Sequence, residues 1–219
     1  MIFEDRGEAG HELAAKLRKY ANRSDVVILA LPLGGVPVGY AVAQELNAPL
    51  DIFAVRKLGV PGYEELAMGA IATGGVRVLN EDLVEQLEFS SDVIDRVAGR
   101  EQLELERRER LYRGDRPPIN VRNQIVILID DGLATGSTMR AAVRALRAWQ
   151  PARIVVAVPV GPRASCAELM EEADEVVCAA MPEPFRGVGL WYQNFEQTTD
   201  REVRELLDHA DRPIHRDAA

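Results

Sequence analysis

Short apolar runs alternate with amphipathic segments along most of this 219-residue chain. Five runs rich in valine, isoleucine, leucine and alanine are bounded by polar or glycine-bearing stretches, as is typical of strands buried in a parallel sheet. They span residues 26–31, 50–55, 124–129, 153–158 and 175–179. Helical spacing dominates between them. The order therefore predicts an α/β fold, with a mostly parallel five-stranded sheet and helices on both faces.

Helix-like segments and one glycine-rich stretch account for most of the remaining chain. Helices are expected over residues 8–22, 38–46, 81–87, 91–112, 137–149, 163–173 and 200–209. Residues 58–80 hold closely spaced glycines and one proline among short β-like pieces, which predicts a mobile flap. Because we find no linker between two folding units, we expect one domain over residues 1–219. It would carry the flap, a helical insertion at about 81–116 and a hood at about 182–198.

The most informative stretch is IVILIDDGLATGST, residues 125–138. Its apolar half predicts a strand that delivers Asp130 and Asp131 to the carboxyl edge of the sheet, where open α/β sheets bind ligands. The following turn is rich in hydroxyl residues and opens a helix, and backbone N–H groups at a helix start bind phosphate. The residues of this predicted phosphate cradle are Ala134, Thr135, Gly136, Ser137 and Thr138. A sugar phosphate suits the pattern, because paired carboxylates accept hydrogen bonds from vicinal hydroxyls.

A plain strand-to-helix turn with an aspartate cap would explain one aspartate and one glycine, but not two aspartates and TGST. A Walker loop is excluded because no Gly-Lys-Ser/Thr is present. The stretch resembles the signature of the type I phosphoribosyltransferases: four apolar residues, two acids, three variable residues, then Thr-Gly and a hydroxyl residue. The resemblance implies that Asp130 and Asp131 hold the ribose hydroxyls of 5-phosphoribosyl 1-pyrophosphate (PRPP). Residues 134–138 would then wrap its 5′-phosphate.

A second match follows the first predicted strand, where LPLGGVPVG occupies residues 31–39. The family keeps its pyrophosphate-binding loop here, and often has a basic residue after the second strand. The residues so implicated in pyrophosphate binding are Leu33, Gly34, Gly35, Arg56 and Lys57. The segments VRKLG and WYQNF, with the order of strands and loops over roughly residues 5–210, resemble a little-characterised bacterial branch of predicted phosphoribosyltransferases.

Two positions depart from the family pattern. Leu33 stands where that branch usually has an arginine. Loss of a cation beside a trianionic leaving group should weaken PRPP binding or turnover, since a charged hydrogen bond contributes about 1.5–3 kcal/mol. Ala134 stands where 6-oxopurine enzymes have an aspartate that contacts the purine. The loop is closer to that of adenine enzymes, and the base acceptor is left unassigned.

The resemblance implies an enzyme that moves the phosphoribosyl group from PRPP to a nitrogenous base, with Mg²⁺ as cofactor. Asp130 and Asp131 would be its catalytic pair and would reach the metal through water. Trp191, Tyr192 or Phe195 would stack on the base, with packing of the hood as the alternative role. Two other functions stay open. One is a non-catalytic PRPP- or nucleotide-binding sensor, with the arginine-bearing helix as its partner surface. The other is a phosphosugar enzyme without pyrophosphate chemistry, which leaves the LPLGGVPVG segment of residues 31–39, here called the glycine loop, unexplained.

Composition narrows the setting of this protein. Its net formal charge is −9, which disfavours nucleic acid as a partner because such binding depends on a basic face. No apolar run approaches the ~20 residues of a membrane span, and MIFEDRGEAG does not have the pattern of a signal peptide, so a cytoplasmic location is expected. Cys166 and Cys178 lack metal-site spacing and are expected to be reduced core residues. His11, His209 and His215 lie outside every motif, and a homodimer stays open.

Overall fold

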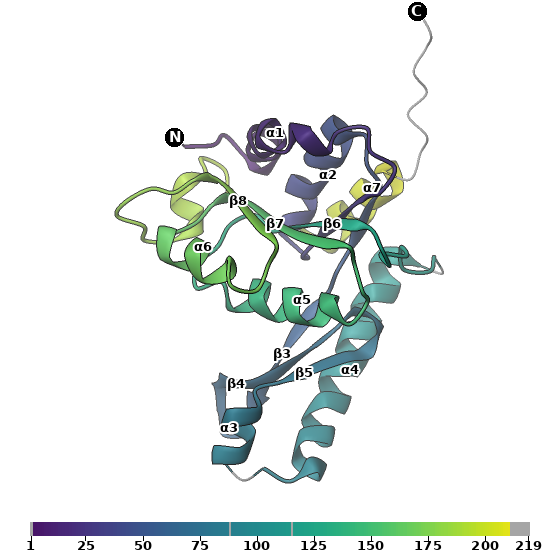
Figure 1. Cartoon of the computed structure of the whole chain (residues 1–219), viewed down its shortest axis with the longest axis vertical. Helices are drawn as coiled ribbons and strands as arrows, with labels where there is room; N and C mark the ends of the chain where they lie inside the picture. Colours follow the sequence, from purple (N-terminus) through teal and green to yellow (C-terminus); the bar gives the residue numbers. More distant parts are fainter. Residues whose placement is uncertain (1, 88, 115, 211–219) are drawn as a thin grey trace, which may run out of the picture.

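Five parallel strands form the central sheet, in the order β2-β1-β6-β7-β8 (Figure 1). The computed structural model describes residues 2–87, 89–114 and 116–210. The strands are β1 (Val26–Ala30), β2 (Leu50–Ile52), β6 (Ile125–Ile129), β7 (Arg153–Val160) and β8 (Glu175–Ala180). Neighbouring strands in this order are parallel, and β1, β6 and β7 are almost completely buried. The predicted fold with its five-stranded parallel sheet is confirmed.

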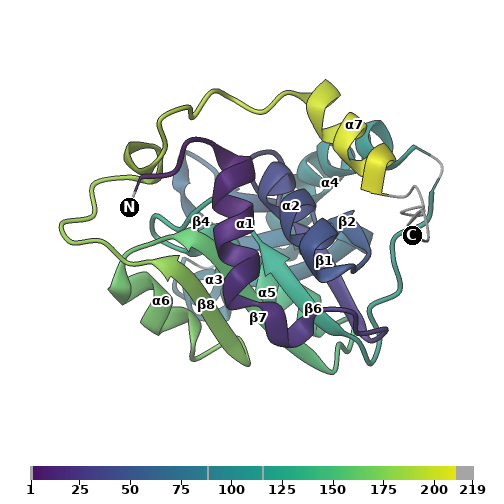
Figure 2. The same ribbon diagram turned by 90° about the horizontal axis from the view of Figure 1, so that it is seen from above.

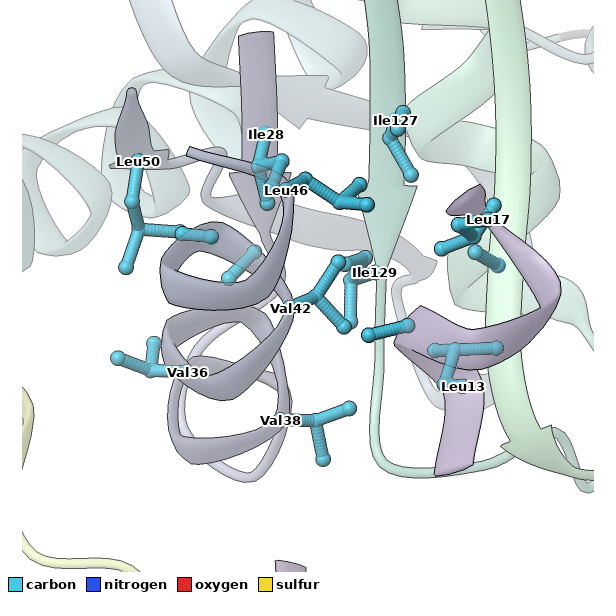
Figure 3. Packing of buried hydrophobic residues seen from close by; sticks show 14 of the residues in the cluster. Leu13, Leu17, Ile28, Val36, Val38, Val42, Leu46, Leu50, Ile127 and Ile129 are labelled. Carbon is cyan, nitrogen blue, oxygen red and sulfur yellow. The ribbon is translucent and has the colours of Figure 1, made fainter. Parts of the chain in front are cut away.

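Helices cover both faces of this sheet (Figure 2). One face carries α1 (Arg6–Lys16), the 3₁₀ turn η1 (Arg18–Tyr20), α2 (Gly35–Leu46) and α7 (Asp200–Ala210), and the other carries α5 (Ser137–Arg147) and α6 (Arg163–Leu169). Leu13 of α1 and Val42 of α2 belong to the same core as Ile127 of β6 (Figure 3). Alternate residues of β1 point to opposite faces of the sheet. Ile28 packs in the core on the side of α1 and α2, and Leu29 packs in the core on the side of α5 and α6.

Two helices begin earlier than the sequence pattern predicted. The helix expected from residue 38 begins at Gly35, because Pro37 lies in its first turn, where the missing N–H breaks no helical hydrogen bond. The helix expected from residue 8 begins at Arg6. Asp5 caps it, and the carboxylate of Asp5 accepts a hydrogen bond of 2.9 Å from Glu8 N. Both earlier starts bring helix N-termini closer to the carboxyl edge of the sheet.

A second, antiparallel sheet occupies the segment predicted as a flap. It consists of β3 (Val55–Val60), β4 (Tyr63–Ala72) and β5 (Val76–Leu79), with the 3₁₀ turn η2 (Thr73–Gly75) between the last two. The single strand predicted over residues 50–55 is wrong, because β2 ends at Ile52 and Val55 already belongs to the second sheet. Thr73 fixes this change of sheet, since its Oγ1 accepts a hydrogen bond of 2.8 Å from Ala54 N. A continuous apolar run cannot show where a chain changes sheets.

Helix α4 (Ser91–Arg113), preceded by α3 (Glu81–Gln86), packs on one face of the second sheet, away from the central one (Figure 1). A buried ion pair ties its end to the central sheet. Arg113 Nε lies 3.1 Å from Asp51 Oδ1, and Arg113 Nη2 donates to Ile52 O at 3.1 Å. Both charged side chains are less than a tenth exposed, so the pair fixes where α4 meets β2.

The chain returns over the sheet edge after β8. The 3₁₀ turn η3 (Val188–Trp191) leads into an extended segment, residues 192–199, which we call the strap. Tyr192 forms an isolated parallel bridge with Phe3, and Asn194 N donates to Glu4 O at 2.9 Å. Figure 2 shows the strap running past the first turns of α1 and α2 towards α7. In the described part of the chain, no helix has the length and apolar content needed to cross a membrane.

Candidate functional site

Two loops meet at the carboxyl ends of the neighbouring strands β1 and β6. Leu31 N donates to Ile129 O at 2.8 Å, which ties the start of one loop to the end of the other strand. A β-carbon on Gly34 would overlap Asp131 Oδ2 and lie 2.7 Å from its Cγ. A β-carbon on Gly35 would lie 2.8 Å from Ile129 O. The fold therefore brings the two glycines of the predicted pyrophosphate loop against the predicted ribose-binding carboxylates.

The predicted phosphate cradle forms the start of α5. Gly136 has a φ of +73°, a left-handed conformation that costs glycine little and turns the chain into the helix. Thr135, Ser137 and Thr138 are exposed, and the hydroxyl oxygens of the first two lie 2.9 Å apart. The first-turn N–H groups of a helix lack partners within the helix, and here hydroxyls gather beside them. The turn therefore suits an anion.

Neighbouring elements hold the turn between the carboxylates and the cradle. Gly132 leaves no room for a side chain, because a β-carbon there would lie 2.5 Å from Val188 Cγ1 of η3. Ser165 Oγ, from α6, donates to Ala134 O at 2.9 Å. The cradle is thus supported by both the hood and the helix behind it.

Asp130 and Asp131 lie in an environment that disfavours two negative charges. Burial, together with the charge of Asp131, raises the pKa of Asp130 well above its ordinary value. Burial also raises the pKa of Asp131, and the adjacent Arg6 guanidinium offsets only part of that rise. Asp131 N donates to Asp130 Oδ1 at 2.9 Å, which orients the first carboxylate. Such a pair is suited to a ligand that brings hydroxyl donors and a cation.

Arg6 is part of this site, although the sequence pattern did not identify it. Its Nε donates to Asp131 Oδ2 at 2.9 Å and its Nη1 to Glu196 O at 2.7 Å. Its Cζ lies 4.1 Å from the centre of the Phe195 ring. No motif marks this arginine. Because Arg6 directly follows the helix-capping Asp5, the sequence shows that it lies at the start of α1. The sequence does not show that the Arg6 side chain pairs with Asp131.

The three aromatic residues proposed to meet a base occupy different environments. Tyr192 is 6% exposed, packs between the rings of Phe3 and Phe195, and donates a hydrogen bond of 2.6 Å to Asp131 O. Burial raises the pKa of its hydroxyl, so it stays protonated and continues to donate. Trp191 is half-buried, and its indole nitrogen has no hydrogen-bond partner among the described residues. Phe195 is 36% exposed beneath the guanidinium of Arg6.

The remaining predicted pyrophosphate residues lie on two different elements. Leu33, which follows a cis peptide bond after Pro32, is half-buried against the core between α1, α2 and the sheet. Arg56 and Lys57 lie on β3. The Arg56 guanidinium pairs with Glu101 of α4 at 2.6 Å, and Lys57 is exposed. The cation that lies against the glycine loop is therefore Arg6 rather than Arg56.

The sequence matches the phosphoribosyl transferase domain family over residues 3–192, and the chain belongs to this family. It is 46% identical to Rv0571c of Mycobacterium tuberculosis (strain H37Rv), which carries the provisional name of a phosphoribosyl transferase. That match covers all of this chain but 48% of the relative, so the chain spans about half the relative's length.

Two solved structures share the fold of this chain. TT1426 from Thermus thermophilus is 38% identical and superimposes with a TM-score of 0.85, covering 94% of this chain and 98% of that one. A hypothetical protein from Neisseria gonorrhoeae, solved with bound ppGpp, shares the fold at 14% identity and a TM-score of 0.52, covering 95% of this chain and 94% of that one.

Proposed function

We propose that the protein transfers the 5-phosphoribosyl group from PRPP to a nitrogenous base and releases pyrophosphate. One observation carries the proposal: a carboxylate pair, an anion cradle and a glycine loop converge on the ends of two adjacent strands. Each part suits one portion of PRPP: its ribose hydroxyls, its 5′-phosphate and its pyrophosphate. Membership in the phosphoribosyl transferase family supports the same class of reaction.

The reaction needs positioning and charge more than acid–base groups. The bond between ribose C1 and the pyrophosphate oxygen breaks, and its electron pair leaves with pyrophosphate. The lone pair of a base nitrogen forms the new C1–N bond, and the proton of that nitrogen passes to water. Positive charge develops on the ribose ring next to Asp130 and Asp131, which accept hydrogen bonds from its hydroxyls. Gly34 N donates to the pyrophosphate.

Mg²⁺ fits the donor set at this site. The ion is usually bound by one or two carboxylates together with substrate phosphates, and it keeps several waters. Asp130 and Asp131 supply such a pair. Within residues 2–87, 89–114 and 116–210, no group of three or more histidine, cysteine, aspartate or glutamate side chains could complete a protein cage. When bound, the ion neutralises charge on the pyrophosphate.

The acceptor base would bind beside the hood. Phe195 is 36% exposed, and the buried indole N–H of Trp191 has no hydrogen-bond partner among the described residues. Tyr192 instead supports the carboxylate pair through its bond to Asp131 O. The strands of residues 58–75 would act as the lid that excludes water from the reacting ribose. Ala134, in place of an aspartate, leaves the class of base open.

A screen of nucleobases with PRPP and Mg²⁺, followed by measurement of pyrophosphate release, tests this function. We expect one class of base to give release that depends on both PRPP and the base. Asp131→Asn is the inactive control. If calorimetry shows that the protein binds PRPP, but no base gives pyrophosphate release, the transferase function is contradicted.

A non-catalytic PRPP- or nucleotide-binding regulator is the second candidate. Leu33 favours it, because the pyrophosphate loop lacks the cation that would stabilise a leaving group. The regulator would bind PRPP but would not consume it, whichever base is present. The same screen, combined with calorimetry, separates the two candidates.

A further inference from the structure

Arg6 lies where the pyrophosphate end of PRPP would bind. Its Nε is 3.2 Å from the position that a β-carbon on Gly34 would occupy, and 2.9 Å from Asp131 Oδ2. The guanidinium therefore lies over the first glycine of the loop, although it comes from the first residue of α1. Its side chain is only 11% exposed, so this cation is held in place rather than solvated.

The loop itself offers few groups to a trianionic ligand. Leu33 is uncharged and packs partly against the core. Gly35 N already donates to Leu31 O, and Val36 N to Leu33 O, each at 3.1 Å. Leu33 N and Gly34 N have no acceptor among the residues that the structure describes. These two amides carry no net charge, so a cation that balances the anion has to come from outside the loop.

Arg6 has unused hydrogen-bond donors. Its Nε donates to Asp131 and its Nη1 to Glu196 O, while Nη2 has no acceptor within the described part of the chain. The Phe195 ring packs against one face of the guanidinium, with Arg6 Cζ 4.1 Å from the ring centre. Nη2 can therefore donate to a phosphate oxygen while Nε and Nη1 keep their partners.

We propose that Arg6 is the cation of the pyrophosphate site and performs the role that Leu33 cannot. This inference rests on the proposed function. When ribose hydroxyls donate to Asp131, that carboxylate has partners besides Arg6, and the guanidinium shares its donors between Asp131 and the pyrophosphate. Negative charge grows on the leaving group as the C1–O bond breaks, so Arg6 acts mainly on the transition state.

Calorimetry with inorganic pyrophosphate and with ribose 5-phosphate, each with Mg²⁺, separates this role from a purely structural one. Arg6→Ala should weaken pyrophosphate binding by about tenfold or more, and ribose 5-phosphate binding by less than about twofold. Arg6→Lys keeps the charge but loses the forked donors, so its loss should be smaller. Arg18→Ala removes an exposed arginine after the same helix and should change neither affinity.

A second variant keeps the test decisive where Arg6→Ala disturbs the fold. In the Arg6→Ala background, Leu33→Arg returns a cation to the same loop. Pyrophosphate affinity should recover to within roughly threefold of wild type. An arginine at position 33 would not restore the bonds of Arg6 to the strap, so recovery reports on the ligand and not on folding.

Equal losses for pyrophosphate and ribose 5-phosphate in Arg6→Ala, without recovery by Leu33→Arg, would mean that Arg6 only positions Asp131 and the strap, and would overturn the assignment. The proposed function fails differently. A wild-type protein that binds pyrophosphate through Arg6, yet releases none from PRPP with any base, supports the Arg6 assignment and removes the transferase. An active protein whose pyrophosphate affinity does not depend on Arg6 does the reverse.

Discussion

Gly34 and Asp131 are in such close contact that no side chain fits on the glycine. A β-carbon there would overlap Asp131 Oδ2 and lie 2.7 Å from its Cγ. The backbone of Gly34 has φ −62° and ψ −29°, which any residue adopts, so the glycine is required by space and not by conformation. This contact seats the loop after β1 against the carboxylate pair after β6.

Gly34→Ala should therefore move the loop away from Asp131. We expect PRPP affinity to fall by about tenfold or more, and the free energy of unfolding to fall by about 1–3 kcal/mol through overpacking. Gly99→Ala is the matched control. It lies exposed in α4 with nothing near its β-carbon, and should stabilise the protein by ~0.5–1 kcal/mol without affecting binding. Calorimetry and urea unfolding measure both effects, and wild-type affinity in Gly34→Ala would refute the close seating of the loop.

Asp131→Asn should weaken Mg²⁺–PRPP binding by roughly tenfold or more, as expected for a lost charged hydrogen bond of ~1.5–3 kcal/mol. The amide cannot replace the carboxylate as the partner of both Arg6 and a ribose hydroxyl. Asp25→Asn, at an exposed ion pair with Arg23, is the control. A folded Asp131→Asn protein with unchanged calorimetric affinity would remove the aspartate from the site.

The raised pKa of Asp130 has a consequence for stability. A group with a higher pKa in the folded state binds more protons there than in the unfolded chain. Its contribution to stability is therefore lost as the pH rises from the ordinary value of 3.8 through the raised pKa. Asp130→Asn removes the ionisable group and with it this loss of stability. The free energy of unfolding of the ligand-free variant should exceed that of wild type at pH values above the raised pKa, and by less at acidic pH. PRPP binding should be lost.

Urea unfolding of wild type and Asp130→Asn at about pH 5 and about pH 8 checks this expectation. The amide oxygen can still accept the bond from Asp131 N, so the comparison isolates the charge. A destabilised Asp130→Asn protein at the higher pH would show that the ionised carboxylate is not the unfavourable group.

The cradle should bind an anion without any sugar attached. In crystals grown from phosphate, we expect a phosphate at the turn of residues 135–138, held by first-turn amides and hydroxyls. Ser137→Ala should lower phosphate affinity by several-fold, since one neutral hydrogen bond contributes about 0.5–1.5 kcal/mol. A well-ordered turn without an anion would count against the cradle.

Leu33→Arg should raise kcat/KM with any accepted base and leave ribose 5-phosphate affinity within about twofold. Under the proposed function, the 5′-phosphate would bind in the cradle at the start of α5 and would make no contact with the loop after β1. If Arg6 already supplies the charge, the gain should be smaller in wild type than in Arg6→Ala, which a double-mutant cycle measures. If the protein is a regulator, the same change should tighten PRPP binding without any turnover. Unaltered binding and turnover would place residue 33 outside the pyrophosphate site.

Features that depend on neighbouring residues could be read from the sequence. Asp130 and Asp131 lie next to the cradle because they precede it directly on a strand-to-helix turn. Five continuous apolar runs were sufficient to predict a parallel sheet, since strands buried on both faces have no polar alternation. The glycine loop could be assigned in the same way, because its place after the first strand puts it at the same sheet edge.

Contacts between distant segments were decided only by the tertiary structure. Arg6 and Asp131 are 125 residues apart, and no spacing or motif links them. Tyr192 was a candidate for stacking on a base, yet its ring is buried on Phe3 and its hydroxyl bonds to Asp131 O. The end of β2 at Ile52 was likewise invisible inside an apolar run. A hydrophobic pattern records that a side chain is buried, but not which segment buries it. The partners of Arg6 and Tyr192 therefore exist only once the strap has folded over the ends of the strands.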